Sequence, residues 1–206
     1  EANMKALVTG ANGLLGHHVV MQLLDRKHDV RIIVISTKDI CFDLSRVEVE
    51  LGNFTESSVF RKAVVGCHAV IHIAAVTATN LLNYHDYVPV NLDANRMILD
   101  VCNEQNISTL IFVSTTNTIG YGSNDNHSDE KTPIQFPFTQ SFYARTKLEA
   151  EKMYESAAKA PKSDSESHIV IIHPAFMIGA YDVKPSSGKL MLSSLKTRLI
   201  LVPRGA

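Results

Sequence analysis

Residues 9–16 read Thr-Gly-Ala-Asn-Gly-Leu-Leu-Gly and directly follow the apolar run Lys5-Ala6-Leu7-Val8. Gly10, Gly13 and Gly16 are spaced three residues apart between a strand-like and a helix-like stretch. In such a turn one glycine makes the tight bend, one lets a diphosphate approach the backbone, and one packs helix against strand. The helix N-terminus then offers free N–H groups to the anion. The stretch predicts a dinucleotide-binding turn. Because a glycine triplet alone is a weak signal, this prediction needs further motifs elsewhere in the chain.

Strand-like and helix-like stretches alternate along the chain, and the strands are continuous apolar runs, as expected when both faces are buried. The expected strands are 5–8, 29–35, 47–51, 69–74, 110–113 and 168–172, and the expected helices are 14–26, 90–102 and 142–159. This alternation predicts an α/β fold with a doubly wound parallel sheet of Rossmann type and right-handed crossovers. We assign residues 4–180 to that domain. Residues 181–206, with a possible helix and strand at 190–201, are expected to begin a C-terminal substrate-binding region.

The composition bounds the class of protein. A hydrophobic content of 45% with 20% charged residues is ordinary for a globular domain. The 20 basic and 21 acidic residues form no basic stripe, so no nucleic-acid partner is expected. No apolar stretch reaches the length of a membrane span, and a strand that begins by Met4 leaves no room for a signal peptide. Three widely spaced cysteines are typical of reduced thiols, so we expect a cytoplasmic protein.

Tyr143 and Lys147 lie four residues apart on an expected helix, and therefore on one face of it. A phenol is a poor acid–base catalyst at neutral pH, because its pKa is near ~10. A neighbouring ammonium group favours the phenolate and is expected to lower that pKa. Taken alone, such a pair is more often two surface residues of a helix, but here it follows a glycine-rich turn in an alternating α/β chain.

Ser114, Thr115 and Thr116 directly follow the expected fifth strand. The carboxyl ends of parallel strands border the ligand crevice of an open sheet. A hydroxyl group there can donate a hydrogen bond to a substrate carbonyl while Tyr143 transfers its proton. The alternative is a set of turn residues that satisfy their own backbone.

These motifs together resemble the extended short-chain dehydrogenases/reductases, the group of NAD(P)-dependent epimerases and dehydratases and dihydroflavonol-reductase-like enzymes. The resemblance rests on the glycine turn and on 66–75, Val90-Asn91, 112–115, Glu130-x-x-Pro133, Tyr143-x-x-x-Lys147 and His173-Pro174. It implies a catalytic triad of Thr115, Tyr143 and Lys147, with Thr in place of the commoner Ser and with Thr116 as the alternative hydroxyl. It also implies a homodimer in which the helices 90–102 and 143–159 pack against their mates.

The resemblance further implies a set of residues along a bound NAD(P). Besides Tyr143 and Lys147, these are Gly10, Asn12, Gly13, Leu14, Leu15, Ser36, Lys38, Asn53, Phe54, Ala74, Ala75, Val76, Asn91, Val113, Ser114, Pro174, Ala175 and Phe176. Asn53-Phe54 replaces the family's usual Asp-Leu beside the adenine.

The end of the second strand bears on the choice of cofactor. An acidic residue there binds the ribose 2′-hydroxyl of NAD, whereas a basic residue accepts the 2′-phosphate of NADP. This chain has Ile35-Ser36-Thr37-Lys38, without an acid. We therefore expect NADP, with NAD as the alternative and a solvated Lys38 as the simpler interpretation.

Other polar residues receive simpler interpretations. His17, His18 and His72 show no metal-ligand spacing, so no metal site is expected. Glu151, Lys152, Glu155 and Lys159 are interpreted as a solvated helix face. The connection 120–140, with Tyr121, Phe136 and Phe138, is long enough to be functional, and its aromatic rings either contact a substrate or fold the loop.

Three functions follow as hypotheses. The first is an NAD(P)-dependent oxidoreductase that acts on a small molecule with a carbonyl or secondary alcohol, by hydride transfer with the Thr-Tyr-Lys triad. The second is a nucleotide-sugar epimerase or dehydratase. The third is a dinucleotide sensor without catalysis, which the retained Tyr143–Lys147 pair disfavours.

Overall fold

The computed structural model describes residues 3–78, 81–123, 125–160, 167–183 and 188–196. Its centre is a parallel sheet of six strands in the order β3-β2-β1-β4-β5-β6. The strands are β1 (Lys5–Thr9), β2 (Asp29–Val34), β3 (Glu48–Leu51), β4 (Ala69–His72), β5 (Thr109–Val113) and β6 (His168–Ile172). The chain order reverses between β1 and β4, which pair in register from Ala6 opposite Ala69 to Thr9 opposite His72. The predicted doubly wound sheet of Rossmann type is confirmed.

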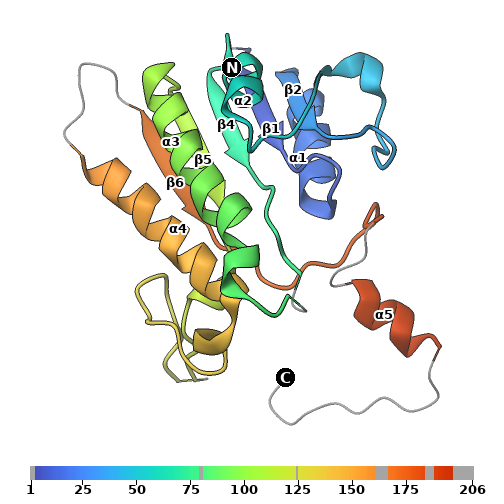
Figure 1. Cartoon of the computed structure of the whole chain (residues 1–206). Helices are drawn as coiled ribbons and strands as arrows, with labels where there is room; N and C mark the ends of the chain where they lie inside the picture. Colours follow the sequence, from blue (N-terminus) through green and yellow to red (C-terminus); the bar gives the residue numbers. More distant parts are fainter. Residues whose placement is uncertain (1–2, 79–80, 124, 161–166, 184–187, 197–206) are drawn as a thin grey trace.

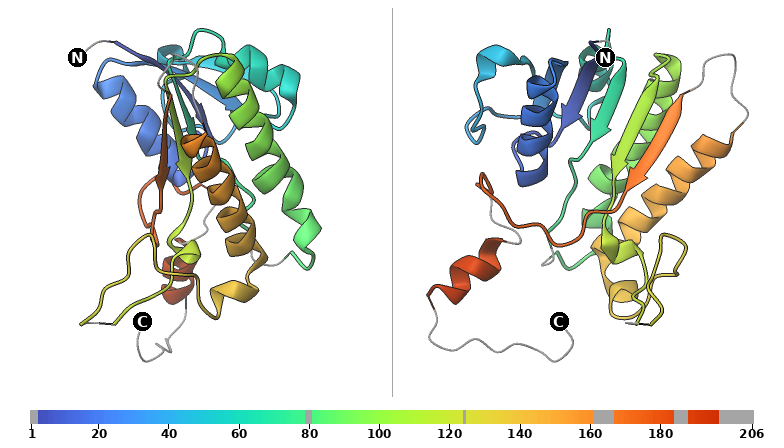
Figure 2. Two further views of the ribbon diagram at one scale, coloured as in Figure 1. Left: turned by 90° about the vertical axis from the view of Figure 1, so that its left-hand side faces the viewer. Right: turned by 180° about the vertical axis from the view of Figure 1, so that it is seen from behind.

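The helices are α1 (Leu14–Asp25), α2 (Ser57–Val64), α3 (Ala94–Glu104), α4 (Phe142–Lys159) and α5 (Gly188–Ser194). Helix α1 lies on one face of the sheet, and α2, α3 and α4 lie on the other (Figures 1 and 2). The hydrophobic core is correspondingly divided into two clusters, one on each face of the sheet. Val20 of α1 packs with Val8 and Ile32 in one cluster, and Phe60 of α2, Ile98 of α3 and Tyr154 of α4 lie in the other.

Helix α2 was not among the expected elements, although Phe60, Ala63 and Val64 repeat at helical spacing and are buried. The expected helix 90–102 is preceded by a wide turn of π type over Pro89–Asp93, and α3 then runs to Glu104. Helix α5 begins two residues before the segment 190–201 in which a helix was expected, and the expected strand at the end of that segment lies outside the described residues. None of the described helices is long and apolar enough to cross a membrane.

Candidate functional site at the carboxyl edge of the sheet

The turns that follow the strands gather the residues predicted for a cofactor at one edge of the sheet. The glycine turn follows β1, Ser36 and Lys38 follow β2, and Asn53 and Phe54 follow β3. Ala74 to Val76 follow β4, Ser114 and Thr115 follow β5, and Pro174 to Phe176 follow β6. Because all strands are parallel, these turns share the carboxyl edge, where ligands bind in open α/β sheets.

The glycine turn has the geometry that a diphosphate requires. Gly10 has φ +74°, and a Cβ there would lie 2.8 Å from the Ala74 nitrogen. A Cβ on Gly16 would lie 2.0 Å from the Gly10 oxygen, so α1 can pack on the turn only with glycine here. A Cβ on Gly13 would meet nothing closer than 3.5 Å, so the protein itself leaves that side of the turn open.

The N-terminus of α1 fits an anion. No side chain hydrogen-bonds to the Gly13 cap, and the first turn carries no acidic residue. The N–H groups of Leu14 and Leu15 belong to that first turn, where α-helices leave their donors without intrahelical partners. An uncapped N-terminus beside an open glycine is the arrangement in which Rossmann-type proteins hold a dinucleotide diphosphate.

A buried Thr9–His72 contact braces this turn against the end of β4. The Thr9 hydroxyl oxygen accepts hydrogen bonds from the N–H groups of Ile73 and Ala74, at 3.1 and 3.2 Å. It therefore donates its own hydrogen to His72 Nδ1, 2.8 Å away, which leaves the ring proton on Nε2. Nε2 is buried without a hydrogen-bond partner in the described part of the chain. Burial and, to a smaller extent, the charge of Lys147 lower the pKa of His72 to about 3, so the ring stays neutral.

Asn91 positions the segment that follows β4, and this role differs from the expected cofactor contact. Its side chain is 1% exposed. Oδ1 accepts from the Val76 N–H at 2.9 Å, while Nδ2 donates to the Val76 carbonyl and to Thr146 Oγ1. The amide is thus engaged within the protein, and Asn91 positions Val76 rather than offering a free polar group.

Thr115 and Tyr143 meet at the end of β5. The Thr115 hydroxyl lies close enough to the Tyr143 phenol to lower its pKa, and Tyr143 lies in the first turn of α4. The Thr116 N–H instead donates to the Pro174 carbonyl at 3.1 Å. Of the two threonines considered, the structure therefore brings Thr115 to the phenol.

The pKa of Tyr143 differs from the sequence-based expectation. Burial raises the pKa of the phenol, and the hydrogen bond from Thr115 opposes this. The expected lowering by Lys147 is wrong for this structure. Lys147 Nζ donates to the Val113 carbonyl at 2.7 Å and lies 4.0 Å from the centre of the Phe112 ring.

The side chain of Ser114 also has a role different from the expected cofactor contact. Its hydroxyl donates to the carboxylate of Glu151 on α4, and the Thr118 hydroxyl donates to the same carboxylate at 2.6 Å. Glu151 is 6% exposed. Its interpretation as part of a solvated helix face is therefore wrong, because the inner side of α4 packs there on β6 and on the turn Thr116–Thr118.

The remaining predicted residues lie at the rim of the site. Ser36 and Lys38 are exposed, and the Lys38 N–H donates to Ser36 Oγ at 3.2 Å. Asn53 Oδ1 accepts from the Thr55 N–H, and Phe54 lies 5.4 Å from the His72 ring. Phe176 is exposed, and Asn12, Ala74, Ala75 and Pro174 are half-buried. In the 120–140 connection the Tyr121 hydroxyl donates to the Phe136 carbonyl, so this ring helps to fold the loop.

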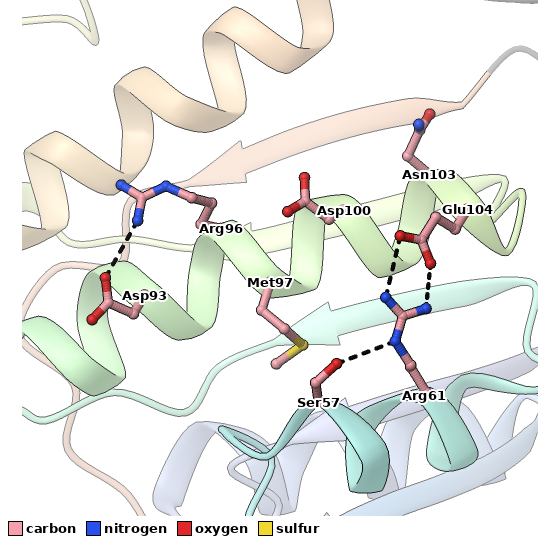
Figure 3. Close-up of a pocket in the computed structure, with 8 residues that line it drawn as sticks. All are labelled: Ser57, Arg61, Asp93, Arg96, Met97, Asp100, Asn103 and Glu104. Carbon is pink, nitrogen blue, oxygen red and sulfur yellow. Dashed lines mark hydrogen bonds and ion pairs between the residues drawn. The ribbon is translucent and has the colours of Figure 1, made fainter.

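A separate pocket lies between α2 and α3, with a cavity volume of about 430 Å³ (Figure 3). Its charged groups pair with one another, Arg61 with Glu104 and Arg96 with Asp93. None of its lining residues belongs to the turns at the carboxyl edge. Among the described residues no group of three or more His, Cys, Asp or Glu side chains is arranged to hold a metal ion.

The fold and the glycine turn define a Rossmann-type protein whose candidate site lies at the carboxyl edge. The chain belongs to the NAD dependent epimerase/dehydratase family, whose model matches residues 6–199. It is 25% identical over 184 residues to the decarboxylating sterol-4-alpha-carboxylate 3-dehydrogenase of Saccharomyces cerevisiae, covering 85% of this chain and 52% of that protein. It is 29% identical over 164 residues to the uncharacterized UDP-glucose epimerase YtcB of Bacillus subtilis, covering 73% and 50%.

The fold matches that of solved structures. One is the Thermus thermophilus UDP-glucose 4-epimerase in complex with NAD, with a TM-score of 0.68, 22% identity, and coverage of 82% of this chain and 54% of that one. The chain spans about half the length of the curated relatives it matches.

Proposed function

We propose that this chain carries the cofactor-binding part of an NAD(P)-dependent oxidoreductase that interconverts a secondary alcohol and a carbonyl. The observation that supports the proposal is the grouping of Thr115, at the end of β5, with Tyr143 on α4 and with Lys147 one helical turn further on. The similarity to a 3-dehydrogenase supports this reaction class. The 120–140 connection and residues from 181 onward are proposed to contribute to the substrate side.

The chain's own residues then divide the work. Tyr143 gives its phenolic proton to the carbonyl oxygen during reduction and takes it back during oxidation. Thr115 donates a hydrogen bond to the same oxygen, and the Lys147 ammonium would hold the ribose hydroxyls of the dinucleotide. A nicotinamide bound at the carboxyl edge would supply or accept the hydride. Gly10, Gly13 and the N-terminus of α1 would hold its diphosphate, and Ala74, Ala75 and Val76 would flank it.

NADP is the proposed cofactor, with NAD as the alternative. The support is the exposed pair Ser36 and Lys38 at the end of β2, where the hydroxyl and the ammonium are accessible to a 2′-phosphate. We also propose a homodimer through α3 and α4, which rests on the family resemblance, and a cytoplasmic location, which rests on the three widely spaced cysteines. Sedimentation velocity over a range of protein concentrations tests the dimer.

A sugar-nucleotide epimerase or dehydratase is the second candidate. The similarity to a UDP-glucose epimerase favours it. In such a reaction the same Tyr143 and Lys147 would act, but the nicotinamide would be restored within each turnover. Conversion of UDP-glucose without net change in nicotinamide absorbance would identify this case.

The Tyr143→Phe variant tests the proposed chemistry. Wild type and variant are assayed with NADPH and NADH against a panel of ketones and aldehydes, and dinucleotide binding is measured by calorimetry. We expect kcat to fall by about 10²–10⁴ because the proton donor is lost, while the Kd of the dinucleotide stays within about twofold.

The matched control is Tyr84→Phe, which removes a phenol that the proposed function does not use and is expected to leave kcat unchanged. Turnover that survives in Tyr143→Phe contradicts the triad. Dinucleotide binding by a wild type that turns over neither the panel nor UDP-glucose supports the sensor instead.

A further inference from the structure

A buried carboxylate lies next to the proposed triad, and the proposed function gives it no part. Glu151 follows Lys147 by one turn of α4 and is 6% exposed. Its carboxylate accepts hydrogen bonds from Ser114 and Thr118, which flank Thr115 on either side. His173 Nε2, just after β6, lies 3.2 Å from Glu151 Oε1. Groups from two segments outside α4 thus converge on one buried carboxylate.

Burying a carboxylate is costly unless hydrogen bonds and an opposite charge compensate. An apolar residue would fill this position of α4 at lower cost, as Ala150 and Tyr154 do nearby. The two hydroxyl donors satisfy hydrogen-bond acceptors of the buried carboxylate and so offset part of the cost of burying it.

We propose that Glu151 is a positioning residue for the reaction. Its carboxylate fastens the end of β5, which carries Thr115, to the helix that carries Tyr143 and Lys147. The same negative charge keeps the Lys147 ammonium ionised. This role rests on the proposed function, in which Lys147 acts on the bound dinucleotide as a cation.

The surroundings of Lys147 explain why it needs an anion. Burial lowers the pKa of Lys147 to about 7, and the charge of Glu151 opposes that lowering. The Phe112 ring and the Val113 carbonyl are uncharged contacts. Of the other titratable groups nearby, His72 is neutral, His173 touches Glu151, and Tyr143 lies one turn before Lys147 on α4.

The charge of Lys147 is measured directly by NMR on protein with lysines labelled at ¹³Cε, without cofactor or substrate. The Lys147 signal is assigned by its loss in Lys147→Met. In Glu151→Gln, which keeps the shape but removes the charge, we expect the Lys147 titration midpoint to fall by about one pH unit or more. The control Glu155→Gln neutralises an exposed carboxylate one turn further along α4 and is expected to leave the midpoint unchanged.

A second readout follows the pH dependence of carbonyl reduction. In Glu151→Gln the loss of kcat with rising pH is expected to begin at a lower pH, displaced by the same amount as the Lys147 midpoint. A purely structural role would lower kcat without moving the profile. An unchanged Lys147 midpoint in folded Glu151→Gln, judged by circular dichroism, overturns the proposal.

Reciprocal coupling keeps the test decisive if Glu151→Gln does not fold. Since the two charges interact, replacing Lys147 by Met must raise the titration midpoint of the Glu151 carboxyl group, measured with ¹³Cδ-labelled glutamate. Equal Glu151 midpoints in wild type and Lys147→Met overturn the proposal. Because both titrations use the cofactor-free chain, failure of the coupling is distinguishable from failure of the proposed function, which shows as absence of hydride transfer in wild type.

Discussion

Lys38 stands at the exposed end of β2, where the choice between the two nicotinamide dinucleotides is made. We expect Lys38→Ala to weaken NADP binding about fivefold, because an exposed charge pair contributes ~1 kcal/mol. NAD lacks the 2′-phosphate, so its Kd is expected to stay unchanged. Calorimetry with both dinucleotides checks this, with Lys152→Ala on the exposed side of α4 as the control. Equal weakening of both dinucleotides would contradict a phosphate contact at Lys38.

His72 links a single buried ring to the acid stability of the domain. Its pKa in the folded protein is about 3, against an ordinary value of 6.5. Below pH 6.5 the unfolded chain therefore binds a proton at His72, whereas the folded protein binds it only near pH 3. The contribution of the neutral His72 ring to the free energy of unfolding is complete above pH 6.5. It is lost as the pH falls from 6.5 towards 3, at about 1.4 kcal/mol per pH unit.

The variant His72→Asn tests this linkage, because its carbonyl oxygen can still accept the Thr9 hydroxyl hydrogen bond. Its free energy of unfolding in urea is expected to fall less steeply than that of wild type between pH 6.5 and pH 4. The slopes should differ by about 1.4 kcal/mol per pH unit. Parallel curves for the two proteins would mean that His72 does not set this pH dependence.

At the scale of the elements, the glycine turn separates packing from ligand approach. Gly16 is required by the contact of α1 with the Gly10 carbonyl, whereas Gly13 faces open space. We expect Gly16→Ala to lower the free energy of unfolding by about 3 kcal/mol, because its Cβ has no room. Gly13→Ala should unfold close to wild type and yet bind NAD and NADP at least ~10-fold more weakly. Thermal unfolding and calorimetry compare the two, and equal dinucleotide affinity in Gly13→Ala would exclude the turn as the diphosphate site.

Helix α4 shows how much of the site could be predicted from local patterns. Its bounds were expected correctly, and the spacing of Tyr143 and Lys147 placed both side chains on one face. The burial of Glu151 could not be predicted with the same method, because Lys152, Glu155 and Lys159 around it are exposed. Which carboxylate turns inward depends on Ser114 and Thr118, which belong to another segment. Helix α2 was not predicted from the sequence, because its apolar repeat is short and is interrupted by charged residues.

At the scale of the whole molecule, the two faces of the sheet are covered unequally. Helix α1 packs over β1 and β2 (Figure 2). Val170 and Ile172 of β6 remain 42% and 39% exposed on their face of the sheet. Exposed apolar strands at a sheet edge promote association. We expect the double variant Val170→Thr with Ile172→Thr to bind less of a fluorescent apolar dye and to self-associate less, as measured by light scattering. Threonine keeps the strand propensity, so an unfolded variant is not expected, and unchanged dye binding would place the apolar surface elsewhere.

The sequence by itself determined the alternating elements, the parallel sheet and the turn at residues 9–16, because apolar periodicity and glycine geometry are local properties. It also placed Tyr143 and Lys147 on one helix face. Only the tertiary structure decided that Thr115 rather than Thr116 meets the phenol, that Asn91 and Ser114 serve the protein's own interior, and that Glu151 is buried beside Lys147. Those outcomes depend on groups from separate strands and helices that meet only when the sheet assembles. Burial at that place shifts the pKa values of the side chains, and this burial cannot be read from the residues that are adjacent in the sequence.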